Sequence, residues 1–200
     1  MTGYTDYRFL LPVPENINME ISRYKKASVK HIGSFQSMDS PAHISLKTLE
    51  RQKPYYADQT IERLELQLKT LPPVLLHING FAYFPHLHGK MTIYAAIKST
   101  PAADNWFEEI KKQLKVKKGI LPHITVCRNI AGADFEKLWP HFRHKHWLEP
   151  FWVDQLKISK RDSLDRYGNF NAFKTIRFKN TQHLHNEANK SSTDEQINLF

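Results

Sequence analysis

Hydrophobic positions along the chain follow two different periods, which predicts a protein built from both strands and helices. A run of apolar and aromatic residues at 7–13 predicts a first strand, which prolines bring to an end. Ile17, Ile21 and Tyr24 then recur at spacings of four and three, as expected for a short helix with one apolar face. The segment 27–35 is interpreted as a further strand.

The next part of the chain predicts a helix followed by a hairpin. Asp58 is expected to cap a helix whose apolar stripe ends at a pair of prolines. That stripe consists of Ile61, Leu64, Leu68 and Leu71. Two apolar runs, 74–84 and 91–97, are separated by a short segment with proline and glycine, and we interpret them as a β-hairpin.

A similar order of elements then repeats. Asp104 and Asp134 are each expected to cap a helix, and a strand at 121–127 lies between these two helices. Two final strands are predicted at 151–159 and 172–178. The repeated order of strand, helix, strand and helix suggests an internal duplication, and the mixture of hairpins and helices indicates an α+β fold with antiparallel sheet.

The length and composition fit a single domain. The 200 residues can enclose a sizeable core, and 40% hydrophobic content is typical of a globular chain. We expect one bilobal domain over residues 1–180 and a polar, flexible tail over residues 181–200. A single cysteine, no apolar leader and no long apolar run favour a soluble cytoplasmic protein without a membrane span.

Net charge narrows the range of partners. The formal charge of +9 favours a polyanion, of which nucleic acid is the first candidate, although solvated surface lysines would explain the same surplus. The chain contains no phosphate-binding loop, so ATP-driven chemistry has no support. Histidine pairs such as His86 and His88 do not have the spacing of a zinc signature, and we expect no metal and no cofactor.

The most informative motif is a tripeptide that occurs twice. His43-Ile44-Ser45 recurs as His123-Ile124-Thr125, 80 residues later. In a strand, side chains two positions apart share one face, so each copy presents an imidazole and a hydroxyl side by side. Two such pairs facing one cleft would supply a proton acceptor, a proton donor and two hydroxyl donors around a small anion.

These two copies resemble the paired H-x-[ST] signature of the 2H phosphoesterase superfamily. Arg128, three residues after the second hydroxyl, makes the chain similar to the 2′-5′ RNA ligase and RNA 2′,3′-cyclic phosphodiesterase family. The resemblance covers roughly residues 5–180. It implies a bilobal fold of two pseudo-symmetric antiparallel sheets with flanking helices around a central cleft.

The resemblance also implies residue roles. His43 and His123 would act as general base and general acid, with their order left open, and Ser45, Thr125 and Arg128 would hold the phosphate. Arg128 lies an odd number of residues after His123, so it reaches the same face only if the strand ends or bulges near the cysteine between them.

We therefore expect a metal-independent phosphodiesterase that acts on RNA 2′,3′-cyclic phosphate or 2′-5′-linked ends, with 2′-5′ ligation as the reverse reaction. Two alternatives stay open: a phosphodiesterase of a small cyclic or ADP-ribose-derived nucleotide, and an RNA-binding protein with little turnover. A cleft that continues as a basic groove would favour RNA over a small ligand.

Two further expectations concern partners. The last residues of the chain resemble the short peptide by which bacterial proteins dock on the DNA sliding clamp, through Gln196, Leu199 and Phe200. Apart from this docking and an RNA end or small nucleotide, we expect a monomer.

Overall fold

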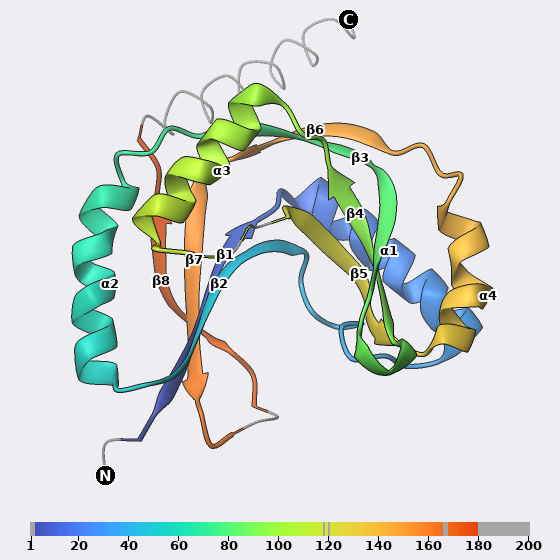
Figure 1. Cartoon of the computed structure of the whole chain (residues 1–200), viewed down its shortest axis with the longest axis horizontal. Helices are drawn as coiled ribbons and strands as arrows, with labels where there is room; N and C mark the ends of the chain where they lie inside the picture. Colours follow the sequence, from blue (N-terminus) through green and yellow to red (C-terminus); the bar gives the residue numbers. More distant parts are fainter. Residues whose placement is uncertain (1–2, 118, 120, 166–167, 180–200) are drawn as a thin grey trace, which may run out of the picture.

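The computed structural model describes residues 3–179 except 118, 120, 166 and 167, and within this range it contains eight strands and four α-helices (Figure 1). In chain order the elements are β1 (Thr5–Pro12), α1 (Glu15–Ile32), β2 (His43–Gln52), α2 (Pro54–Leu68), β3 (Val74–Pro85), β4 (Met91–Ile97), α3 (Pro101–Gln113), β5 (His123–Ile130), α4 (Gly132–Phe142), β6 (Leu148–Val153), β7 (Gln155–Asp162) and β8 (Asn171–Arg177).

The strands form one antiparallel sheet in the order β6-β3-β4-β5-β2-β1-β7-β8. The sheet has two four-stranded halves, which lie on the two sides of the molecule in Figure 1. Among the described residues, only the pair Ile44 and Ile124 joins them, where β2 meets β5. The expected antiparallel α+β fold is confirmed, and the two expected sheets are the two halves of one sheet that is nearly divided at its centre.

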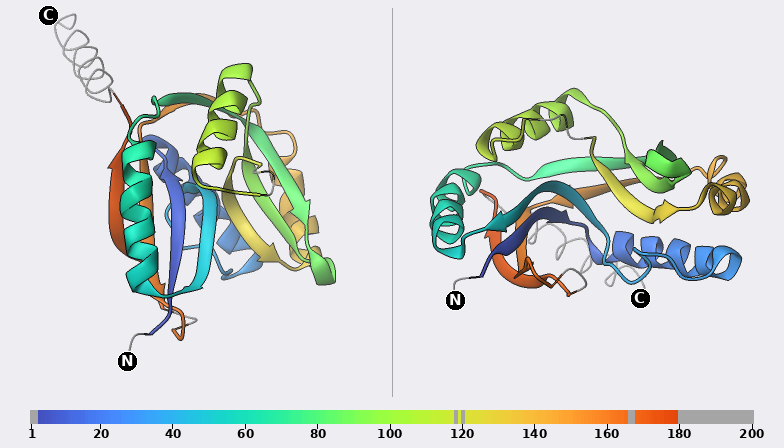
Figure 2. Two further views of the ribbon diagram at one scale, coloured as in Figure 1. Left: turned by 60° about the vertical axis from the view of Figure 1, so that its left-hand side comes forward. Right: turned by 60° about the horizontal axis from the view of Figure 1, so that its bottom comes forward.

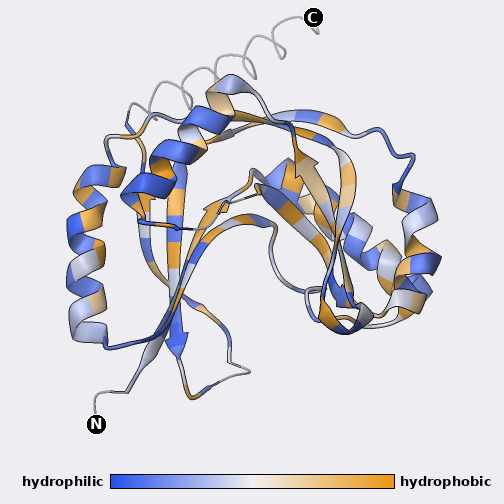
Figure 3. Ribbon diagram, viewed as in Figure 1, coloured by the Kyte–Doolittle hydropathy of each residue, from blue (hydrophilic) through white to orange (hydrophobic). Residues whose placement is uncertain are grey.

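The helices pack in two pairs. α2 contacts α3, and α1 contacts α4, so each pair combines one helix from each repeat of the expected duplication (Figure 2). Along the strands, hydrophobic and polar residues alternate, as Figure 3 shows by colour. In β1, the side chains of Tyr7, Phe9 and Leu11 are buried in the core, while Arg8 and Leu10 between them face the opposite side of the sheet.

The predicted strand at 27–35 is wrong, because α1 continues through it as far as Ile32. The apolar pattern stops at Tyr24, but the buried face of the helix goes on with Lys25 and Ser28, two polar residues. A buried face that changes from apolar to polar has no hydrophobic period, so the sequence pattern ended the helix too early.

The predicted helix caps are also wrong. Asp58 lies inside α2, which begins with a proline, and its carboxylate accepts a hydrogen bond of 2.6 Å from the Tyr7 hydroxyl. α3 is capped by the Thr100 hydroxyl, and Asp104 lies in its first turn. α4 starts after Ala131, which makes no capping hydrogen bond. Asp104 and Asp134 lie in the first turn of their helices, where an acidic residue interacts favourably with the helix dipole and is hard to distinguish from a cap in a sequence.

The predicted strand at 151–159 is two strands, β6 and β7, which lie in opposite halves of the sheet. The chain crosses between the halves at Asp154. Burial changes phase there, because Phe151 and Val153 are buried before the crossing and Leu156 and Ile158 after it. A shift from odd to even positions within one apolar run is the sequence signal for such a break.

No helix in the described part of the chain is both long enough and apolar enough to cross a membrane. The expected tail at 181–200, with its clamp-like residues Gln196, Leu199 and Phe200, lies outside the described residues.

Candidate active site

Where the described strands pair across the two halves of the sheet, the pair of Ile44 and Ile124 brings the two tripeptides together. Ile44 pairs with Ile124, and both side chains are 0% exposed. Because the strands are antiparallel, His43 lies beside Thr125 and Ser45 beside His123, and these neighbours face away from the side on which the isoleucines are buried. The four side chains predicted from the tripeptides therefore share one small area of the sheet.

Both histidines are oriented in the same way. Nδ1 of His43 lies 2.8 Å from the carbonyl oxygen of Pro41, and Nδ1 of His123 lies 2.7 Å from that of Leu121. A carbonyl oxygen only accepts hydrogen bonds, so Nδ1 carries the proton and donates it in each case. Nε2 of each ring is left to accept or donate a proton at a substrate.

The surroundings of the two rings disfavour the imidazolium form. Burial has the largest effect and lowers the pKa of His43. The hydrogen bond to the Pro41 carbonyl opposes it, and the charges of Lys25 and Arg8 lower the pKa further. Burial and the charge of Arg128 likewise lower the pKa of His123. The pKa of each imidazole therefore lies below the ordinary range for histidine.

A pocket of about 270 Å³ lies at this point of the sheet. His43, Ser45, Thr125 and Arg128 line it, which brings together four of the five predicted site residues. His123 does not line this pocket but adjoins it, beside Ser45 across the strand pair. The rings of Phe84 and Tyr94 hold His123 from the other side, at centroid distances of 4.9 and 5.1 Å.

Arg128 reaches the pocket through a bulge in β5. Ile93 pairs with Cys127 while the next residue, Tyr94, pairs with Thr125, so β5 carries one extra residue at this point. The bulge reverses the alternation, and it turns Cys127 into the core and Arg128 toward the pocket. Burial raises the pKa of the Cys127 thiol to about 11, which is the behaviour of a packing residue and not of a reactive thiolate.

Several basic side chains of the pocket were not predicted. Arg8 and Arg161 line it from β1 and β7, and Lys25 lines it from α1. Burial, followed by the charges of Arg161 and Arg128, lowers the pKa of Arg8. Among the described residues Arg8 has no carboxylate within ion-pairing distance, whereas Arg161 pairs with Asp6 at 3.2 Å. The sequence could have indicated Arg8, because it lies on the polar side of a strand in which apolar and polar residues alternate.

Buried Lys25 connects the segment before the first tripeptide to the strand that carries the second. Its side chain is 3% exposed, and its ammonium group donates to the carbonyl oxygens of Ser37 at 2.8 Å and Ser40 at 2.6 Å. Ser40 directly precedes Pro41, whose carbonyl orients His43. The Ser37 hydroxyl in turn accepts a hydrogen bond of 3.1 Å from the backbone N–H of Arg128. One buried lysine thus supports both the first histidine and the arginine.

Lys47 also lines the pocket, but its ammonium group donates to the carbonyl oxygen of Leu114 at 2.6 Å, where α3 has just ended. In the described part of the chain no three histidine, cysteine or carboxylate side chains gather where they could hold a metal ion.

Comparison with known proteins gives a family and a fold. A family model described as the 2′-5′ RNA ligase superfamily matches residues 13–165. Among solved structures, E. coli LigT in its apo form is similar with a TM-score of 0.62 and 12% identity, over 88% of this chain and 99% of that chain.

Two further structures show the same fold. TT0787 of Thermus thermophilus has a TM-score of 0.62 and 16% identity, over 86% of this chain and 97% of its own. E. coli LigT complexed with 3′-AMP has a TM-score of 0.58 and 11% identity, over 88% of this chain and 98% of its own. Comparison with curated proteins gives no significant sequence match.

Proposed function

The chain belongs to the 2′-5′ RNA ligase superfamily, and from this premise we propose that it is a phosphodiesterase acting on RNA 2′,3′-cyclic phosphate or 2′-5′-linked ends. The observation that carries the proposal is the convergence of the two tripeptides at the Ile44–Ile124 pair, with both histidines presenting Nε2. The expected chemistry is general acid and base catalysis by His43 and His123.

The reaction with a cyclic phosphate can be followed atom by atom. Nε2 of one histidine takes a proton from a water molecule, whose oxygen forms a new bond to phosphorus. The bond from phosphorus to one ribose oxygen breaks, and Nε2 of the other histidine donates its proton to that oxygen. The product is a phosphate monoester with a free hydroxyl, and each histidine has changed its protonation state once.

The pocket is suited to stabilise the charge that develops on the phosphoryl oxygens. The hydroxyls of Ser45 and Thr125 and the guanidinium of Arg128 face it as hydrogen-bond donors. Arg8 adds a half-buried positive charge that forms no ion pair among the described residues. An entering phosphate also raises the pKa of both histidines, because a nearby negative charge favours the imidazolium form, so binding promotes the protonation that the general acid needs.

A ribonucleotide is the favoured class of ligand on two grounds. E. coli LigT, which shares the fold, has been solved with 3′-AMP, and the pocket here carries a surplus of basic side chains. The 2′-5′ ligation reaction is the same sequence of steps in reverse, with a ribose hydroxyl as the nucleophile. Without a coupled energy source, water is the prevailing nucleophile and hydrolysis is the expected direction.

The test is a panel of phosphodiesters assayed in the presence of EDTA. It contains RNA with a 2′,3′-cyclic phosphate end, a 2′-5′-linked dinucleotide, a cyclic mononucleotide and an ADP-ribose-derived cyclic phosphate. We expect turnover of the RNA substrates that drops by about 10²-fold or more in His43→Ala and in His123→Ala. Full activity in either variant would exclude this site, turnover of only the small molecules would assign the alternative substrate class, and RNA binding without turnover would exclude an enzyme.

A further inference from the structure

A second and larger pocket opens directly beside the active site. It measures about 900 Å³ and shares His43, Arg8, Arg161 and Phe170 with the smaller pocket. We call this second pocket the flanking groove. The active-site pocket, at about 270 Å³, is at the lower limit of ligand sites, which span about 300–1,000 Å³. It has room for a reacting phosphate and its immediate ribose, so a longer substrate extends beyond it, and the flanking groove offers adjoining space.

The floor of the flanking groove is the same sheet face that carries the active site. Ser45 on β2 pairs with Leu10 on β1, and Leu10 pairs with Lys157 on β7. Directly paired residues share a face, and neighbouring strands lie about 4.8 Å apart, so Lys157 lies about 10 Å from Ser45 along one row. Lys157 is exposed toward the groove, since Leu156 and Ile158 on either side of it are buried in the core.

The charge of Lys157 is available to a ligand. Within the part of the chain that the structure describes, Lys157 forms no ion pair. The flanking groove is lined by the basic residues Arg8, Lys157, Arg161 and Lys174 and by one acidic residue, Asp39, so its charge is predominantly positive. Basic side chains that begin at the active-site pocket with Arg8 and continue into the flanking groove with Lys157 suit the phosphates of a nucleic-acid strand.

An aromatic ring contacts two of the basic side chains that the two pockets share. The ring of Phe170 has the guanidinium carbon of Arg8 at 3.8 Å from its centroid and that of Arg161 at 4.6 Å. These cation–π contacts hold a half-buried ring between the two pockets. Aromatic rings and guanidinium planes are the surfaces on which unpaired bases of single-stranded RNA stack.

We propose that the flanking groove binds the RNA segment next to the reacting end, with a base stacked at Phe170 and Arg8 and a backbone phosphate paired with Lys157. The substrate is then a single-stranded oligonucleotide and not a mononucleotide. This inference rests on the proposed function, because it takes the reacting phosphate to occupy the neighbouring pocket.

Binding without turnover tests the groove. Fluorescence anisotropy of a labelled single-stranded RNA with a 3′-phosphate end, and competition by 3′-AMP, give the two affinities for the full chain. We expect the RNA to bind at least about tenfold more tightly than 3′-AMP. Phe170→Ala should weaken RNA binding about tenfold, equivalent to ~1.4 kcal/mol, which is at the low end of what base stacking contributes. Lys157→Gln should reduce the slope of log affinity against log salt by about one.

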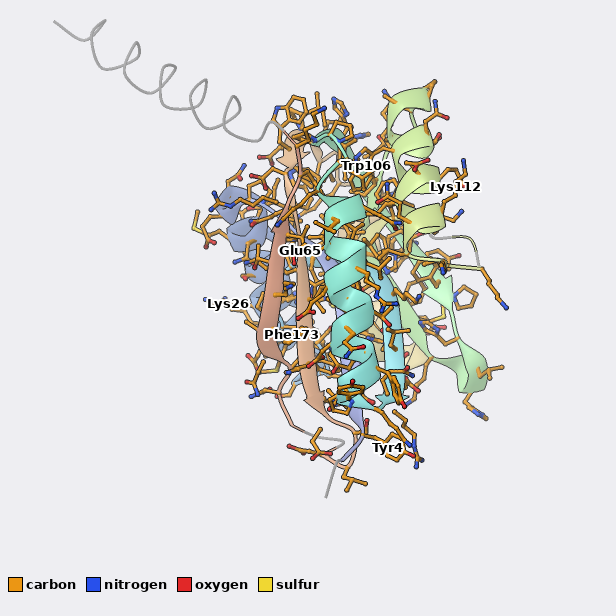
Figure 4. The ribbon with its side chains drawn as sticks, turned by 90° about the vertical axis from the view of Figure 1, so that its left-hand side faces the viewer. Tyr4, Lys26, Glu65, Trp106, Lys112 and Phe173 are labelled. Atoms are coloured by element: carbon orange, nitrogen blue, oxygen red, sulfur yellow. The ribbon has the colours of Figure 1, made fainter. Side chains whose placement is uncertain are left out.

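Two matched controls lie on other parts of the surface. Tyr4 is an exposed aromatic residue beside an arginine, Arg51, whose guanidinium carbon is 5.7 Å from the ring. Lys26 is an exposed lysine on α1. Neither lines either pocket, and Figure 4 shows both at the periphery. Tyr4→Ala and Lys26→Gln should therefore bind the RNA as the wild type does.

The outcomes separate the two proposals. RNA and 3′-AMP binding with equal affinity, or unchanged RNA binding in both Phe170→Ala and Lys157→Gln, would overturn the groove and leave the phosphodiesterase in place. RNA binding that depends on Phe170 in a protein inactive on every phosphodiester would overturn the proposed reaction and keep the groove. Phe170→Leu, which keeps apolar bulk but removes the ring, gives the same answer if the alanine variant does not fold.

Discussion

Replacing Lys25 with methionine should disturb the orientation of active-site residues, although Lys25 itself is not expected to contact the substrate. Methionine has a similar length but no donor, so the variant loses both hydrogen bonds to the carbonyl oxygens of Ser37 and Ser40. Hydrogen bonds from a charged group contribute about 1.5–3 kcal/mol each, and the relief from burying an ammonium group offsets several kcal/mol of that loss. We expect a net destabilisation of about 1–3 kcal/mol, seen as a fall of about 2–10 °C in Tm.

The effect on turnover should be larger than this stability change implies. The turn that carries Ser40 and Pro41 would loosen, and the Pro41 carbonyl would no longer hold His43 in one orientation. A displacement of about 1 Å at a reacting group can cost about 10²-fold, so kcat/KM should fall by about 10- to 100-fold. Steady-state kinetics on an RNA 2′,3′-cyclic phosphate measures this.

A pH profile distinguishes positioning from general destabilisation. The charge of Lys25 is one of the causes that lower the pKa of His43. Removing that charge raises the pKa of His43, so the limb of the kcat/KM profile that belongs to His43 should move to higher pH while the limb of His123 stays in place. Lys26→Met, at the exposed neighbouring position, is the matched control and should change neither limb. A Lys25→Met enzyme with kcat/KM within about twofold of wild type and both limbs unmoved would refute the reasoning.

Three other predictions use the same structure. Burial lowers the pKa of both His43 and His123 below the ordinary value. The dependence of kcat/KM on pH should therefore be bell-shaped, with its maximum below about pH 6.5, the reference pKa of histidine. A maximum near pH 8 would contradict this. Thr125→Val should lower kcat/KM by about 10- to 100-fold with an unchanged melting curve, since it removes one donor to phosphate; a collapsed melt would make the hydroxyl structural. Tyr7→Phe should lower the free energy of unfolding, measured in urea, by about 1–2 kcal/mol, because the buried hydroxyl donates to Asp58 at 2.6 Å. Its kcat/KM should stay at the wild-type value. A loss of activity without a loss of stability would contradict this prediction.

The sequence by itself determined the chemistry of the two tripeptides. Side chains at i and i+2 of a strand share a face wherever the strand lies, so the pairing of each histidine with its hydroxyl is local. The strands at 7–13, 74–84 and 91–97 were predicted for the same reason, because the alternation of β1 and the apolar runs of the β3–β4 hairpin depend on near neighbours. The sequence set a condition for Arg128, that the strand end or bulge near Cys127, and the structure meets it with a bulge.

Only the tertiary structure decided how the two tripeptides meet and which other residues join them. The Ile44–Ile124 pair sets His43 against Thr125 and Ser45 against His123, and no pattern within either strand contains that register. Lys25 belongs to a helix face whose polar residues are buried by packing, so the apolar pattern stopped at Tyr24 and residues 27–35 were interpreted as a strand. Contacts between residues far apart in the chain depend on how the elements pack, and a one-dimensional period carries no record of that packing.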